Sequence, residues 1–184
     1  MSAIKKNCIC AVCIAFCYIL PLAFHGLTLG SILSPMHIPV LLCGIVCGGF
    51  YGALCGIVGP CLSSLLSGMP PASALVSMLP ELCVYGLACG ILMRLLRTKH
   101  LMADIYLSLI PAMLIGRIVG GIAKALLYTG SGEAYSLALW ASSYLTGSLP
   151  GIIAHLVLVP LLVFTLEKAK VIPARYPDIV KQVN

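Results

Sequence analysis

Charged residues are scarce in this chain of 184 residues: Asp, Glu, Lys and Arg make up 9% of it, against 61% hydrophobic residues. The mean hydropathy is +1.11. A soluble domain carries charge at about a quarter of its residues, so a water-soluble domain is excluded. In lipid the backbone must pair its own polar groups, which leaves helices or a closed barrel. The apolar stretches lack the period-two alternation of barrel strands, and we predict an all-α integral membrane protein.

Histidines and carboxylates are missing around the densest group of cysteines. The chain has ten cysteines, and Cys8, Cys10, Cys13 and Cys17 fall in one apolar run. The last three share one helical face, as small packing residues would. Because cysteine is among the most buried residue types, we interpret them as packing residues and predict no metal site.

The long apolar runs predict the membrane spans. About twenty residues cross the hydrocarbon core. The second run, 38–66, is too long for one membrane span and short for two. In chain order the runs are Ile9–Phe24, Ile38–Leu66, Ala74–Leu92, Ile105–Leu127 and Leu137–Leu166.

Basic residues decide how often the second run crosses. Nine of the eleven Lys and Arg residues fall in three clusters, and cytoplasmic segments are rich in such residues. All three clusters lie on one side only if the run 38–66 crosses twice, turning near Gly48-Gly49. We therefore predict six transmembrane helices with the N- and C-termini cytoplasmic, a single membrane domain at 1–170 and a short cytoplasmic tail at 171–184. The clusters are Lys5 and Lys6; Arg94, Arg97 and Lys99; and Lys168, Lys170, Arg175 and Lys181.

Three charged residues lie inside the predicted spans: Glu81, Arg117 and Lys124. Each costs about 2.5–3.5 kcal/mol at the bilayer centre, so each needs a partner or a cavity. Glu81 and Arg117 lie at similar depths on helices of opposite direction and can pair. One interpretation is that this pair fixes helix packing and has no other role. Alternatively, the three residues could line a net-positive pocket, open to the outer side, for an anionic or carboxylate-bearing solute.

Other residues near the predicted outer ends could recognise a ligand. His37, Ser63, Ser64, Met69, Tyr85 and Trp140 lie there. The tryptophan and tyrosine also fit interfacial anchors, and His37 fits a hydrogen-bonded residue at a helix end. We expect His155, deep in the last span, to pack with a backbone hydrogen bond.

Small residues four apart predict close helix approach, within the chain or to another protein. The pairs are Ala11-x-x-x-Ala15 in the first span and Gly116-x-x-x-Gly120 in the fifth.

Several segments together resemble the substrate-binding S components of energy-coupling factor (ECF) vitamin transporters, most like the pantothenate-type branch. They run in order from the first outer loop to the fifth span. The segments are Gly30 to Gly44 with Met36-His37-Ile38-Pro39, Gly59 to Pro70 with the following Pro71, Pro80-Glu81-Leu82 with Tyr85-Gly86, and Gly116-Arg117-Ile118.

The resemblance implies a multi-pass protein of the bacterial cell membrane that captures a vitamin from outside. It would join a transmembrane coupling protein and two ATPase subunits. Ala11 and Ala15 match the small residues with which the family contacts the coupling protein. The chain contains no G-x-x-x-x-G-K phosphate loop, so the partner subunits would hydrolyse ATP. We expect no cofactor on this chain and no nucleic-acid partner.

The sequence predicts no catalytic residue and a set of substrate-binding ones. Pantothenate is the favoured cargo; pyridoxine, hydroxymethylpyrimidine or another vitamin is the alternative. Two other classes stay open: an intramembrane enzyme using Glu81 with His37 or His155, and a structural membrane subunit. The candidate binding residues are His37, Ser63, Ser64, Met69, Glu81, Tyr85, Arg117, Lys124 and Trp140.

Overall fold

The computed structural model describes residues 1–24, 34–130 and 149–176, without the side chains of residues 129 and 130. These residues form helices and no strand, which confirms the predicted all-α class. The helices are α1 (Ala3–Phe24), α3 (His37–Cys47), α4 (Gly49–Ser67), α5 (Ala72–Leu95), α6 (Leu101–Gly130) and α8 (Leu149–Lys168).

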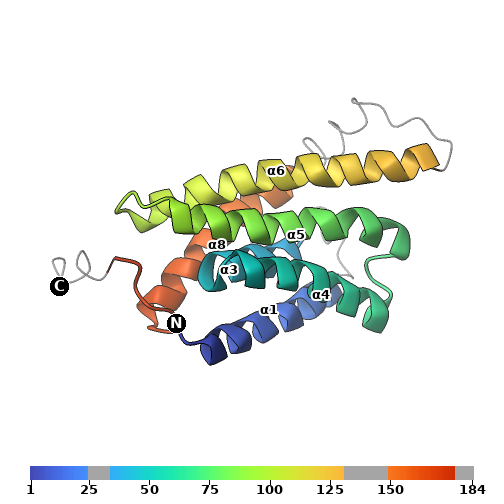
Figure 1. Cartoon of the computed structure of the whole chain (residues 1–184). Helices are drawn as coiled ribbons and strands as arrows, with labels where there is room; N and C mark the ends of the chain where they lie inside the picture. Colours follow the sequence, from blue (N-terminus) through green and yellow to red (C-terminus); the bar gives the residue numbers. More distant parts are fainter. Residues whose placement is uncertain (25–33, 131–148, 177–184) are drawn as a thin grey trace.

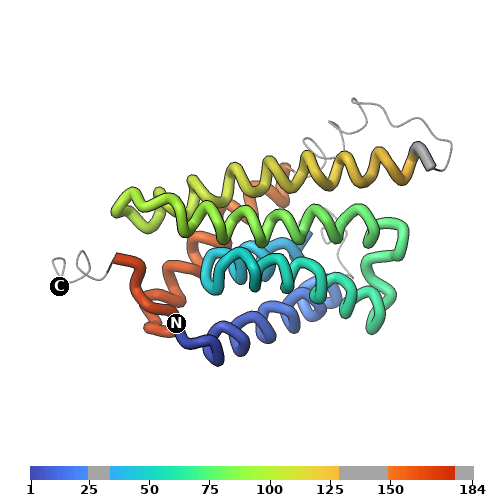
Figure 2. Tube along the Cα trace, in the orientation of Figure 1, coloured from blue at the N-terminus to red at the C-terminus, as the bar shows by residue number. Residues whose placement is uncertain are grey.

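Successive helices run up and down one bundle (Figure 1). The start of α1, the α3–α4 turn, the α5–α6 turn and the end of α8 lie at the end of the bundle marked N and C. The tube in Figure 2 shows the same order along the chain. We call this the basic end, because the predicted basic clusters lie there, and we call the opposite one the far end.

Every described helix except α3 is long and apolar enough to cross a membrane. With 11 residues, α3 is about 16 Å long at about 1.5 Å per residue, short of a hydrocarbon core of about 30 Å. The chain is a multi-pass membrane protein. Six crossings and cytoplasmic termini remain predictions, and residues 137–148 of the last expected span lie outside the described residues.

The predicted break near Gly48-Gly49 is confirmed. Gly48 has φ 103° and ψ 167°, a conformation that favours glycine because a side chain would clash there. Its N–H donates to Gly44 O at 3.0 Å, and its carbonyl accepts from Gly52 N at 3.0 Å. The chain therefore ends α3 and starts α4 within one residue.

Glycines let α3 and α4 touch the backbone of α5. A Cβ on Gly44 or Gly52 would lie 2.5 Å from Gly86 O, and one on Gly86 would lie 2.2 Å from the carbonyl carbon of Gly52. One turn further along, a Cβ on Gly56 would lie 2.5 Å from Leu82 O. In lipid, helices associate through close packing of small residues rather than through exclusion of water. We call these contacts the glycine seam.

We predict that Gly86→Ala destabilises the bundle. The new methyl group would meet backbone atoms that cannot rotate away, and overpacking costs about 1–3 kcal/mol. The melting temperature of the detergent-purified chain should fall by several degrees. Leu87→Ala is the control because Leu87 is 39% exposed and should melt close to the unmodified chain. Equal melting of the two variants would contradict the seam.

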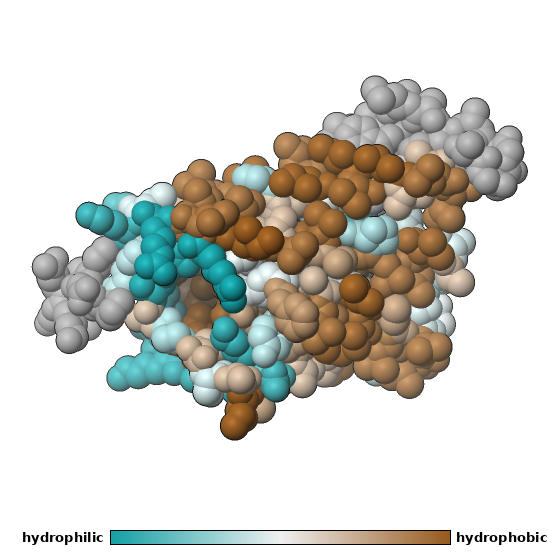
Figure 3. Space-filling model, viewed as in Figure 1, coloured by the Kyte–Doolittle hydropathy of each residue, from teal (hydrophilic) through white to brown (hydrophobic). Residues whose placement is uncertain are grey.

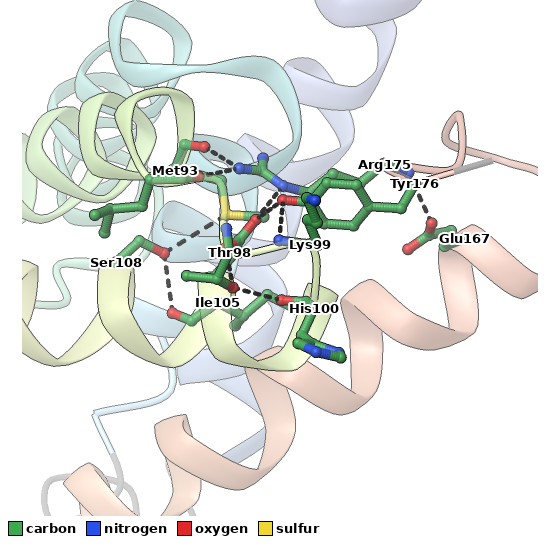
Figure 4. Close-up of polar contacts among 11 residues, drawn as sticks. Met93, Thr98, Lys99, His100, Ile105, Ser108, Glu167, Arg175 and Tyr176 are labelled. Carbon is green, nitrogen blue, oxygen red and sulfur yellow. Dashed lines mark hydrogen bonds and ion pairs between the residues drawn. The ribbon is translucent and has the colours of Figure 1, made fainter. Parts of the chain in front are cut away.

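The expected tail begins as part of the bundle. Ile172 is buried, and Arg175 binds the turn between α5 and α6 (Figure 4). Its Nε lies 2.6 Å from Asp104 Oδ2, and its Nη2 donates to Met93 O and Leu96 O at 2.6 and 2.5 Å. These carbonyls end α5, where backbone acceptors need outside donors.

Asp104 is fully buried and gathers this network around itself. Its Oδ1 accepts from Thr98 N at 2.8 Å and from Thr98 Oγ1 at 2.7 Å. Its Oδ2 accepts from the Tyr176 hydroxyl as well as from Arg175. We call residues 171–176 the strap, since they tie the end of α8 to the α5–α6 turn.

We predict that Arg175→Met lowers the free energy of unfolding by about 1–3 kcal/mol, because a buried carboxylate loses its charged donor. Thermal melting in detergent measures the loss, with Lys99→Met on the same turn as control. In the background of Asp104→Asn the Arg175 change should cost much less, since the two side chains interact directly. Additive effects would show that the ion pair does not hold the strap.

Candidate functional site

Two glycines of α6 seat the side chains of α5 that form the site. A Cβ on Gly116 would lie 2.0 Å from Cδ1 of Tyr85, and one on Gly120 would lie 2.7 Å from Glu81 Oε2. The close approach predicted for Gly116-x-x-x-Gly120 is thus confirmed, and it occurs within the chain. The glycines leave room for a carboxylate and a phenol between two packed helices.

Glu81 contacts an aromatic hydroxyl and an imidazole. Tyr85, one turn further along α5, donates its hydroxyl to Glu81 Oε1 at 2.9 Å. His37 Nε2, at the start of α3, lies 3.9 Å from the same oxygen. The rings of His37 and Tyr85 are 5.4 Å apart. All three residues are at most 7% exposed, so the carboxylate is held inside the bundle by α3 and α5.

His155 of α8 joins this group. Its ring stacks on His37 with centroids 5.4 Å apart and planes at 24°. His155 Nε2 lies 3.3 Å from Ser34 O, and His37 Nδ1 lies 3.1 Å from the same carbonyl. The backbone hydrogen bond expected of His155 is confirmed. The sequence did not place this residue in the site, although a histidine deep in an apolar helix was a signal.

Arg117 is buried on α6. It lies between Gly116, which packs on Tyr85, and Gly120, which packs on Glu81. Among the described residues, the basic side chain within 4 Å of the Glu81 carboxylate is His37, whereas the sequence had suggested Arg117. Lys124, two turns beyond Arg117, is half-buried. We call His37, Glu81, Tyr85, Arg117 and His155 the polar cluster.

The predicted serines have another role in the structure. Ser63 donates to Met69 O at 2.7 Å, and Ser64 donates to Pro70 O at 2.9 Å. They fasten the loop after α4 back onto that helix, while the Met69 side chain is 37% exposed. Trp140 lies outside the described residues.

The two faces of α1 differ in exposure. Cys10, Cys13 and Cys17 are buried against α3 and α4, and Cys17 Sγ lies 4.0 Å from Cys55 Sγ. Their interpretation as packing residues is confirmed. In the described ranges, no group of three or more His, Cys, Asp or Glu residues could hold a metal ion. The Ala11–Ala15 face is exposed.

The model of a protein family described as the ECF transporter substrate-specific component matches residues 5–163. The match covers most of the chain and the whole polar cluster. The chain belongs to this family. No curated protein and no solved structure matches it. The family binds substrate for a transporter rather than acting as an enzyme, and its members work with a membrane coupling protein and ATPases.

We predict that Tyr85→Phe destabilises the chain without ligand. Glu81 would lose a donor in a buried position, which costs about 1–3 kcal/mol. Melting in detergent should show a drop that Tyr106→Phe, on the 39% exposed Tyr106 of α6, does not produce. Identical melting of the two variants would mean that the hydroxyl of Tyr85 does not support the carboxylate.

Proposed function

We propose that the chain captures pantothenate from outside the cell at the polar cluster and delivers it through an ECF module. The observation that carries this proposal is the cluster itself: an acid, an arginine and two histidines buried inside a bundle of apolar helices. Ionisable groups inside a membrane are costly and usually mark a binding site or a transport path.

The position of the cluster supports capture from one side. Glu81 follows the start of α5 at Ala72 by nine residues. At about 1.5 Å per residue its side chain lies about 14 Å along α5 from the far end. A ligand entering from that end would reach the cluster in the first half of the bundle.

Charge supports an outward-facing cluster. The most hydrophilic residues gather at the basic end in Figure 3, and hydrophobic residues cover most of the other coloured surface on that face. Segments rich in Lys and Arg stay in the cytoplasm. We therefore place both termini in the cytoplasm, with six crossings of a bacterial cell membrane in which α3 is the short one.

The chemistry of the cluster fits a carboxylate joined to hydroxyl and amide groups. A guanidinium binds a carboxylate through two parallel hydrogen bonds, so Arg117 is the group we assign to the pantothenate carboxylate, with Lys124 adding positive charge. Glu81, Tyr85 and the two imidazoles offer acceptors and donors for hydroxyl and amide groups.

Delivery depends on partners. The exposed Ala11 and Ala15 provide a surface for the coupling protein, since small residues allow close helix approach. The partner ATPases supply the energy, and the inward-facing state must bind the vitamin more weakly than the outward-facing state.

We predict that low concentrations of pantothenate raise the melting temperature of the detergent-purified chain, and that Arg117→Ala abolishes the shift. Arg97→Ala, at the exposed basic end, is the matched control and should retain it. A panel of other B vitamins is measured in parallel. If only an uncharged vitamin raised the melting temperature, that vitamin would be the cargo in place of pantothenate, and Arg117 would not bind a substrate carboxylate. No shift with any vitamin would contradict the capture proposal.

A further inference from the structure

An apolar groove of about 600 Å³ runs between α1, α3 and α8, away from the polar cluster. Every side chain that lines it is apolar or a cysteine, including Ile9 and Phe24 of α1, Leu42 of α3 and Leu166 of α8. In Figure 2, α1 and α8 approach each other at the basic end and separate away from it.

The groove is long. Its lining on α1 runs from Cys8 to Phe24, 16 residues further along, which is about 24 Å at about 1.5 Å per residue. A groove of this length with an apolar lining suits an extended hydrocarbon chain.

Basic residues flank the groove residues at the basic end. On α8, the helix ends at Lys168, two residues after Leu166 of the groove. Lys170 directly precedes Val171, which also lines the groove. On α1, Lys5 precedes Ile9 by one helical turn, and Lys6 follows Lys5.

The first turn of α1 carries no acidic residue, so the positive end of its helix dipole adds to Lys5 and Lys6. Glu167, next to Lys168, offsets part of the positive charge. Its carboxylate accepts from Arg175 N at 2.8 Å, within the strap.

We propose that the groove binds one phospholipid with an anionic headgroup. An acyl chain would fill the space between α1 and α8, and the phosphate would lie among Lys5, Lys6, Lys168 and Lys170. An apolar channel that ends in cations matches a molecule with a hydrocarbon chain and an anionic end. Lysines next to a membrane attract anionic headgroups by about 1 kcal/mol each. This site is separate from the polar cluster and does not depend on which vitamin is carried.

The test compares phosphatidylglycerol with phosphatidylcholine of the same acyl chains, added to the delipidated full chain in detergent. We expect phosphatidylglycerol to raise the melting temperature more, and native mass spectrometry to retain one such lipid per chain. Lys168→Gln/Lys170→Gln should weaken its binding about 30-fold, because two lysines at about 1 kcal/mol each correspond to that ratio. Arg97→Gln/Lys99→Gln removes two cations at the same end, outside the groove, and is the matched control.

Two further experiments distinguish the contribution of the acyl chain to binding from that of the headgroup. Ala154→Phe, or Val12→Phe on the 54% exposed Val12 of α1, fills the groove and should abolish retention of the lipid. Glycerol 3-phosphate alone should give no shift. Equal shifts with both lipids, binding unchanged in the lysine variant, or a full shift with glycerol 3-phosphate would each overturn the proposal. None of these outcomes bears on the vitamin-binding proposal, which is tested separately by the melting shift with vitamins and the Arg117→Ala variant.

Discussion

Contact between the backbones of α4 and α5 is the constraint on which the rest of the structure depends. Gly52 and Gly86 bring the two main chains together so closely that a single methyl group does not fit. On its other side α5 meets α6 at Gly116 and Gly120. Backbone packs on backbone between α4 and α5, and the glycines of α6 pack on the side chains of Tyr85 and Glu81. Since lipid provides no hydrophobic force between helices, this close packing stabilises the bundle and aims the polar residues of α5 inward.

The polar cluster depends on the close packing of these helices. His37 is its centre, because its ring contacts Tyr85, Glu81 and His155 and its Nδ1 reaches Ser34 O. Side chains from α3, α5 and α8 therefore depend on one imidazole at the start of the shortest described helix. A buried polar network is stable only where its members have partners. A ligand that exchanges hydrogen bonds with His37 would reach all three helices at once.

The sequence predicted where the helices lie better than it predicted which helices and side chains contact one another. Apolar runs located the described helices, and the basic clusters indicated the break at Gly48, because both signals depend on local composition. Helical spacing predicted the packing of Gly116 and Gly120, but spacing gives a face and not the helix opposite it. For that reason the pairing of Glu81 with His37 was missed. The bond between Arg175 and Asp104 joins residues 71 positions apart, and no local pattern indicates it.

The polar cluster lies in the half of the bundle toward the far end, and the strap lies at the basic end. This separation bears on how cargo would move. Between the polar cluster and the strap, the facing sides of α5 and α6 are packed with buried residues such as Cys89, Met93, Ile105 and Leu109. A charged vitamin could not cross this layer without losing its hydrogen bonds, which is costly in an apolar interior. The strap also closes the basic end by tying α8 to the α5–α6 turn. Transport by the proposed capture subunit would therefore require the whole subunit to move against its coupling partner, rather than a channel to open through its core.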